Sequence, residues 1–209
     1  MRIVFYGDSI TDAGRNRDKD FHHSSYGAGY VRDVASDLLN QNPLGFEIIN
    51  RGISGNRIVD LYARIKTDLW NLNPDIISIL IGVNDVWHEI GSKNGVELDR
   101  FERVYRMLIE DTKKVLPNAK IVILEPFVLK GIATEESYDR FLSVKEYAKV
   151  SEQIAKDYNL SFIPLQEKFN KEAEKFGAST CLADGVHPAL YGARIIADEW
   201  MKKFNEEIK

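Results

Sequence analysis

The stretch IVFYGDSIT, residues 3 to 11, decides the fold. Its first half, Ile3 to Tyr6, is continuously apolar, and the chain then turns polar at Gly7, Asp8 and Ser9. An apolar run without alternation is typical of a strand that is covered on both faces, as in a parallel sheet. Ser9 at the end of such a strand is either a helix cap, for which serine is favoured, or a nucleophile.

Further short runs rich in Ile and Val resemble the first one. They cover residues 46–49, 76–81, 121–124 and 161–165. Stretches with apolar residues at helical spacing alternate with these runs, at residues 30–39, 58–69, 101–115, 141–155 and 190–204. This alternation predicts an α/β fold with one parallel sheet and helices on both of its faces. Two polar segments, 12–29 and 86–97, are expected to be long loops, which are often functional in a compact domain.

Composition and charge argue against a nucleic-acid-binding protein and against a membrane-spanning protein. The chain has 209 residues, 29% of them charged, a net charge of −4 and one cysteine, Cys181. We expect one domain over residues 1–209, with no clustered basic face for a nucleic acid and no apolar run of about 18 residues for a membrane span. The first apolar run is too short for a signal peptide, which predicts a cytoplasmic protein.

Small polar motifs follow the predicted strands. GDSIT follows the first, NRGISGNR the second and GVNDVW the third, and DGVHPALYG opens the last helix. In open parallel sheets, ligands bind outside the carboxyl ends of the strands. We therefore expect these motifs to meet at one edge of the sheet.

The motifs contain the groups that acyl transfer needs. Ser9 can serve as the nucleophile, His187 can accept its proton, and Asp184, three residues earlier, can orient the imidazole. The backbone N–H groups of Ser9 and Gly55 and the side-chain amide of Asn84 can surround the oxyanion.

Other residues near the predicted edge are candidate substrate contacts. They are Asp8, Arg57, Trp87, His88, Tyr26 and Phe127. Each also has an ordinary structural role open to it: a turn for Asp8, a salt bridge for Arg57, an exposed loop position for His88, and packing for the aromatic side chains. The residues alone leave these alternatives open.

The motif set GDSIT, GISGN, GVND and DGVHP, in this order over the whole chain, resembles the SGNH/GDSL hydrolases. The resemblance implies a flavodoxin-like, three-layer α/β/α sandwich with a five-stranded parallel sheet, the SGNH hydrolase fold. It also implies a Ser9–His187–Asp184 triad, an oxyanion hole of Ser9, Gly55 and Asn84, and no metal or other cofactor. The longer stretches FYGDSITDAGR and NRGISGNRIVDLYAR look like the bacterial acetylxylan esterases of this family, which implies self-association into a homo-oligomer.

The expected reaction is removal of a short acyl group, acetyl above all, from a carbohydrate such as an acetylated xylo-oligosaccharide. The two long segments are polar, whereas a long acyl chain needs an apolar groove. A thioesterase or lysophospholipase with the same machinery is the alternative. A metal-dependent phosphoesterase that uses Asp8, Asp12, Asp85, Asp184 and His187 as ligands is a more distant one.

Overall fold

The computed structural model describes residues 1–208. Its five strands form one sheet in the order β2-β1-β3-β4-β5, and all neighbouring strands are parallel. The strands are β1 (Arg2–Gly7), β2 (Glu47–Gly52), β3 (Ile76–Leu80), β4 (Lys120–Leu124) and β5 (Ser161–Ile163). This is the flavodoxin-like strand order, so the predicted fold class is confirmed.

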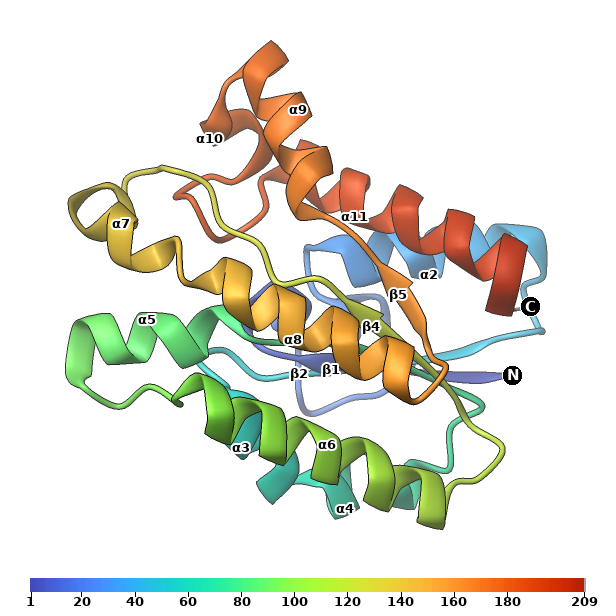
Figure 1. The fold of residues 1–209 in the computed structure, drawn as a ribbon. Coiled ribbons are helices and arrows are strands. Elements are labelled where there is room, and N and C mark those ends of the chain that lie inside the picture. The colour runs from blue at the N-terminus through green and yellow to red at the C-terminus, as the bar shows by residue number, and fades with distance from the viewer. Residues whose placement is uncertain (209) are drawn as a thin grey trace.

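Helices cover both faces of this sheet (Figure 1). Helices α2 (Tyr30–Gln41) and α11 (Leu190–Lys203) pack together on one face, and α3 (Ile58–Ala63), α6 (Leu98–Val115) and α8 (Val144–Asp157) lie on the other. The remaining helices are α1 (Ser9–Asp12), α4 (Ile65–Asp68), α5 (Val83–Ser92), α7 (Tyr138–Phe141), α9 (Gln166–Phe176) and α10 (Ala178–Cys181). The arrangement is the expected three-layer sandwich.

Three local expectations need correction. Segment 86–97 is not a loop throughout, because α5 continues to Ser92. The stretch 58–69 is not one helix: it breaks at Arg64, whose guanidinium stacks on the Tyr6 ring and donates to the carbonyl of Arg51. The stretch 141–155 likewise divides into α7 and α8. Helix α9 was not expected at all, since its sequence is mostly polar.

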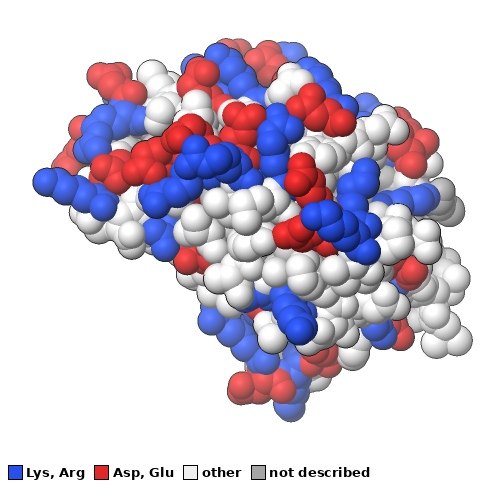
Figure 2. All heavy atoms as spheres, turned by 60° about the horizontal axis from the view of Figure 1, so that its bottom comes forward, with Lys and Arg blue, Asp and Glu red and all other residues white. Residues whose placement is uncertain are grey.

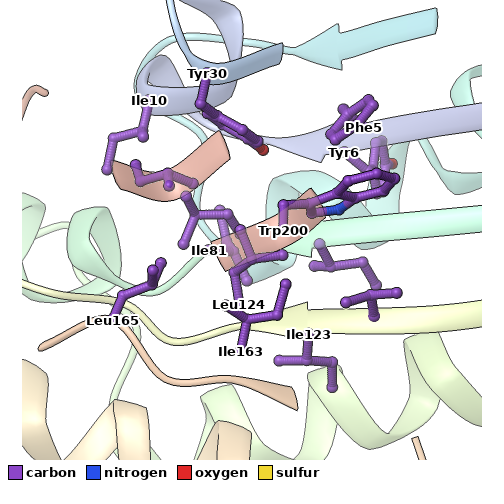
Figure 3. Close-up of a cluster of buried hydrophobic side chains, with 14 of the residues drawn as sticks. Phe5, Tyr6, Ile10, Tyr30, Ile81, Ile123, Leu124, Ile163, Leu165 and Trp200 are labelled. Atoms are coloured by element: carbon purple, nitrogen blue, oxygen red, sulfur yellow. The ribbon is translucent and has the colours of Figure 1, made fainter. Parts of the chain in front are cut away.

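Large aromatic side chains join α11 to the sheet (Figure 3). The Trp200 ring is fully buried, lies 5.2 Å from the Phe5 ring, and donates its indole N–H to the Ser78 hydroxyl at 3.1 Å. This hydrogen bond satisfies the one polar atom of the indole, so the residue can be buried without an unpaired donor. The helix that follows His187 is thereby fixed to β1 and β3.

The face shown in Figure 2 carries both signs of charge in alternation. On α6 the pairs Arg103–Asp99, Arg106–Glu102 and Lys114–Asp111 are three or four residues apart, which brings their side chains together on the helix surface. Figure 2 shows charged side chains of both signs intermixed on one face of the molecule, with uncharged areas between them. Within residues 1–208, no helix has the length and apolar character needed to cross a membrane.

Candidate active site

The ends of three strands bring the sequence motifs together. Gly7 at the end of β1 is in register with Gly52 of β2 and with Leu80 of β3. The residues that follow these three positions therefore leave the sheet at the same edge. They contain Ser9, Gly55 and Asn84.

Ser9 begins the short helix α1. The Asp8 side chain caps this helix by accepting from the Ile10 N–H at 2.9 Å, which fixes the turn between strand and helix. The Ser9 hydroxyl oxygen lies 2.8 Å from Nε2 of His187, although 178 positions separate the two residues in the chain. The predicted nucleophile and base are thus within hydrogen-bonding distance.

His187 is held by a closed loop before α11. The loop is pinned where Leu182 and Pro188 form an isolated bridge and Ala183 N–H donates to the His187 carbonyl at 2.8 Å. Asp184 Oδ2 lies 2.7 Å from the imidazole Nδ1, and Asp184 Oδ1 accepts from the His187 backbone N–H at 2.8 Å. One carboxylate therefore positions both the backbone and the ring of His187.

The charge of Asp184 sets the direction of these hydrogen bonds. Burial opposes its ionisation, but hydrogen bonds from the His187 ring, His187 N–H and Val186 N–H outweigh that cost and lower the pKa of Asp184. Because an ionised carboxylate only accepts, Nδ1 carries the proton and donates to Asp184. Nε2 is then free to accept the Ser9 proton, as a general base must.

Gly55, in the loop after β2, and Asn84, in the first turn of α5, line the same cleft as Ser9. Gly55 has φ +82°, a left-handed conformation that favours glycine. Asn84 is almost fully buried and donates its side-chain Nδ2 to the Asn56 carbonyl at 3.1 Å, which ties α5 to the loop that contains Gly55. An amide nitrogen has two donors, so one remains for a ligand.

A cleft of about 450 Å³ opens over these groups. Its walls include the Trp87 and His88 side chains in addition to Ser9, Gly55, Asn84 and His187. The Trp87 ring lies 5.8 Å from the His187 ring and 5.7 Å from the Phe141 ring. It therefore packs between Phe141 and the imidazole of His187 and forms the wall of the cleft beside that imidazole. Trp87 and His88, two of the candidate substrate contacts, therefore lie at this cleft.

Four other expected substrate contacts lie elsewhere. Arg57 donates to the Asp60 carboxylate and to the Asn94 carbonyl and is not among the residues that line the cleft. Asp8 is buried beneath Ser9 as a helix cap, and Tyr26 is half-buried outside the cleft lining, with its carbonyl bound by Asn50. Phe127 is fully buried against Phe169, with ring centroids 4.4 Å apart, so the expectation that it faces substrate is corrected.

Sequence reasoning missed Ser54 and Ser92, which also line the cleft. Ser54 stands inside the GISGN motif, which was a usable signal, whereas Ser92 depends on α5 being a helix. Within residues 1–208, no three His, Cys, Asp or Glu side chains are grouped as a metal site would need, so the geometry does not favour the metal-dependent alternative.

Known proteins are similar to this chain in sequence. The GDSL-like lipase/acylhydrolase family matches residues 5–195. An acetylxylan esterase of Geobacillus stearothermophilus is 34% identical, over 99% of this chain and 94% of the relative. A rat homologue of isoamyl acetate-hydrolyzing esterase 1 is 26% identical, over 91% of this chain and 76% of the relative.

Solved structures agree. A protein of Parabacteroides merdae described as a GDSL-like lipase superposes with a TM-score of 0.92 at 38% identity, covering 98% of this chain and 95% of the other. Axe2, an acetylxylan esterase from Geobacillus stearothermophilus, superposes with a TM-score of 0.87 at 33% identity, covering 99% and 95%. The chain therefore belongs to the GDSL-like lipase/acylhydrolase family and is a carboxylic ester hydrolase similar to acetylxylan esterases.

Proposed function

We propose that the protein is a serine esterase that removes acetyl groups from carbohydrate, with acetylated xylo-oligosaccharides as substrates. The observation that carries this proposal is the Ser9–His187–Asp184 chain of contacts, 2.8 Å and 2.7 Å long, at the floor of the cleft. Among the solved structures of Axe2 are catalytic mutants in which a serine, an aspartate or a histidine is replaced by alanine. Those are the three residue types that meet here.

The proposed reaction has two steps. The Ser9 oxygen attacks the ester carbonyl carbon while His187 Nε2 takes the hydroxyl proton, and the carbonyl oxygen becomes an oxyanion. His187 then gives the proton to the departing sugar alcohol, which leaves an acetyl group on Ser9. Water attacks this acetyl-enzyme with His187 again as base, and acetate leaves as Ser9 is restored.

In the proposed reaction three donors stabilise the oxyanion. They are the backbone N–H groups of Ser9 and Gly55 and the second amide hydrogen of Asn84, whose residues all line the cleft. Each such donor is typically worth about 3–4 kcal/mol in the transition state. No metal or other cofactor takes part.

The choice of acetyl and of sugar rests on the relatives and on the lining residues. Trp87 presents an aromatic surface to the cleft, and Ser54, His88 and Ser92 supply polar groups beside it. Aromatic rings commonly stack on sugar rings, whereas a long acyl chain would need a continuous apolar groove. Both curated relatives above are named for esters of acetic acid.

The test is acetate release from acetylated xylo-oligosaccharides, with p-nitrophenyl acetate, butyrate and octanoate as a chain-length series. We expect Ser9→Ala to abolish turnover and wild-type kcat/KM to fall as the acyl chain lengthens. An organophosphonate should label Ser9 stoichiometrically. Preference for octanoate would instead favour a lysophospholipase-type or thioesterase-type function, and full activity of Ser9→Ala would reject the mechanism.

A further inference from the structure

Asp12 is a buried acid that the proposed reaction does not use. It is the last residue of α1, the four-residue helix that begins with Ser9, and is only 2% exposed. A carboxylate so far from water needs a reason, because burying a charge is costly unless it is paired and hydrogen-bonded. Its contacts indicate that reason.

The carboxylate binds the loop that presents Gly55. Asp12 Oδ2 accepts from the Ser54 backbone N–H at 3.0 Å and from the Ser54 hydroxyl at 3.1 Å. Ser54 directly precedes Gly55. The Gly55 N–H, which is the donor expected at the oxyanion, is therefore only one peptide bond away from the N–H that Asp12 binds. Asp12 Oδ1 accepts from the Arg15 N–H at 3.2 Å, which closes the turn after α1.

The charge and the hydrogen-bond donors around Asp12 keep its carboxylate ionised. Burial alone would raise the pKa of Asp12, but the ion pair with Arg17 and the two Ser54 donors outweigh it and lower the pKa. Hydrogen bonds to an ionised acceptor are about twice as strong as neutral ones. The Ser54 peptide is therefore held by a strong interaction at neutral pH.

The backbone of the two segments is also in contact. A Cβ at Gly52 would collide with the Asp12 backbone nitrogen, so only glycine lets the end of β2 pass this close to α1. The Ile53 N–H donates to the Gly7 carbonyl at 3.1 Å and extends the contact between the two strands. The carboxylate thus bridges two segments that are already close together.

We propose that Asp12 is a positioning residue of the oxyanion hole, which holds the Ser54–Gly55 peptide in a fixed place relative to Ser9. The inference rests on the proposed function, because it assumes that Ser9 attacks and that Gly55 N–H receives the charge. Ser9, the nucleophile, and Asp12, the residue that binds Ser54, are the two ends of the short helix α1. A shift of the loop would therefore move the Gly55 donor relative to the Ser9 oxygen.

The test uses p-nitrophenyl acetate, so that sugar recognition plays no part. Asp12→Asn keeps the volume but replaces one oxygen with a nitrogen that cannot accept, and we expect kcat to fall about 10-fold with KM within about threefold. Asp12→Ala should lower kcat about 100-fold. The rate of organophosphonate labelling should fall by similar factors, because its adduct places an oxygen in the same hole, while labelling stays at one per Ser9.

A double-mutant cycle shows whether Asp12 acts through Ser54. Ser54→Ala removes the hydroxyl donor, and its effect should be smaller in the Asp12→Asn background than alone, because the two variants remove the same interaction. One control separates this from general loss of charge. Asp37→Asn removes a carboxylate on α2 that is paired with Arg194, and it should retain kcat within about twofold.

The outcomes are distinct. If folded Asp12→Asn has wild-type kcat, or raises only KM, the positioning role is wrong. Should Asp12→Ala fail to fold, the isosteric Asp12→Asn still decides the question. If Ser9→Ala retains activity, the proposed function fails. Inactive Ser9→Ala together with fully active Asp12 variants would overturn only this inference.

Discussion

Asp184 contacts His187 at two points: one carboxylate oxygen binds the ring Nδ1 at 2.7 Å and the other binds the backbone N–H at 2.8 Å. The loop that contains both residues is itself anchored, since Ala133 N–H donates to the Asp184 carbonyl and Leu129 N–H to the Gly185 carbonyl. The ring therefore has little freedom to turn away from Ser9. Its orientation and its tautomer depend on one side chain.

Asp184→Asn should show that dependence. The amide keeps the shape of the side chain but favours the opposite tautomer, in which Nε2 holds the proton and cannot accept from Ser9. We expect kcat on p-nitrophenyl acetate to fall about 10³- to 10⁴-fold with little change in the melting temperature. Asp139→Asn, an exposed acid on α7, is the control. A loss of less than tenfold would mean that Asp184 does not orient the base.

Asn84→Ala should lower kcat about 100- to 1,000-fold, the usual cost of removing one oxyanion donor. The Asn84 amide also binds the Asn56 carbonyl, so stability will fall as well. Steady-state kinetics on the folded fraction, counted by organophosphonate labelling, separates the two effects. An increase in KM at constant kcat would place Asn84 in substrate binding instead of transition-state stabilisation.

The sequence predicted the sheet and the meeting of the motifs because both depend on local patterns. Continuous apolar runs mark buried strands, and parallel strands must all end at one edge, so Ser9, Gly55 and Asn84 could be placed together without coordinates. Side-chain direction in a loop has no such pattern. Phe127 follows β4 at the correct edge, yet its ring turns inward to Phe169. Its position was therefore predictable and its contact was not.

The part played by Asp12 depends equally on tertiary contacts. Within GDSITDAGR it resembles any acid at a helix end, and only the approach of the loop containing Ser54 gives it a partner. The later part of helix α5 was expected to be a loop for a related reason. Most residues of segment 86–97 are polar or glycine, and the helical spacing of Val83, Val86 and Ile90 begins before that segment. Self-association and a cytoplasmic location stay predictions.

His88→Ala should affect sugar esters more than simple ones. The ring lines the cleft one helical turn beyond Asn84, and burial together with the nearby charge of Arg57 lowers the pKa of His88, which favours the neutral form of the ring. A neutral imidazole can both donate to and accept from sugar hydroxyls. We expect kcat/KM on acetylated xylo-oligosaccharides to fall about 10-fold, about 1.4 kcal/mol, mainly through KM.

The comparison that decides this prediction is a ratio. The kcat/KM for the sugar ester divided by that for p-nitrophenyl acetate should fall in His88→Ala and stay constant in His23→Ala, an exposed histidine outside the cleft lining. Equal losses on both esters would show that His88 acts on the reaction centre or on the fold instead of on the sugar.

Asp85→Asn should change how stability depends on pH. Asp85 is fully buried next to Asn84, with one oxygen bound by the Ile58 N–H at 3.1 Å, and burial raises its pKa to about 8. Burial likewise raises the pKa of Asp8 to about 7, and the charge of Asp8 adds to the shift at Asp85. A carboxyl whose folded-state pKa lies above its unfolded value contributes stability at low pH and loses it as the pH rises through the folded value.

The wild type should therefore lose free energy of unfolding between about pH 5 and pH 9 more steeply than Asp85→Asn does, since asparagine keeps the Ile58 hydrogen bond and cannot ionise. Urea unfolding at pH 5, 7 and 9 measures both slopes. Asp111→Asn, a half-buried acid on α6 whose pKa is lowered by hydrogen bonds from Lys114 and Tyr62, should not flatten the slope. Parallel curves for wild type and Asp85→Asn would mean that Asp85 is charged, or its pKa unshifted, in the folded protein, and that burial does not govern this carboxyl.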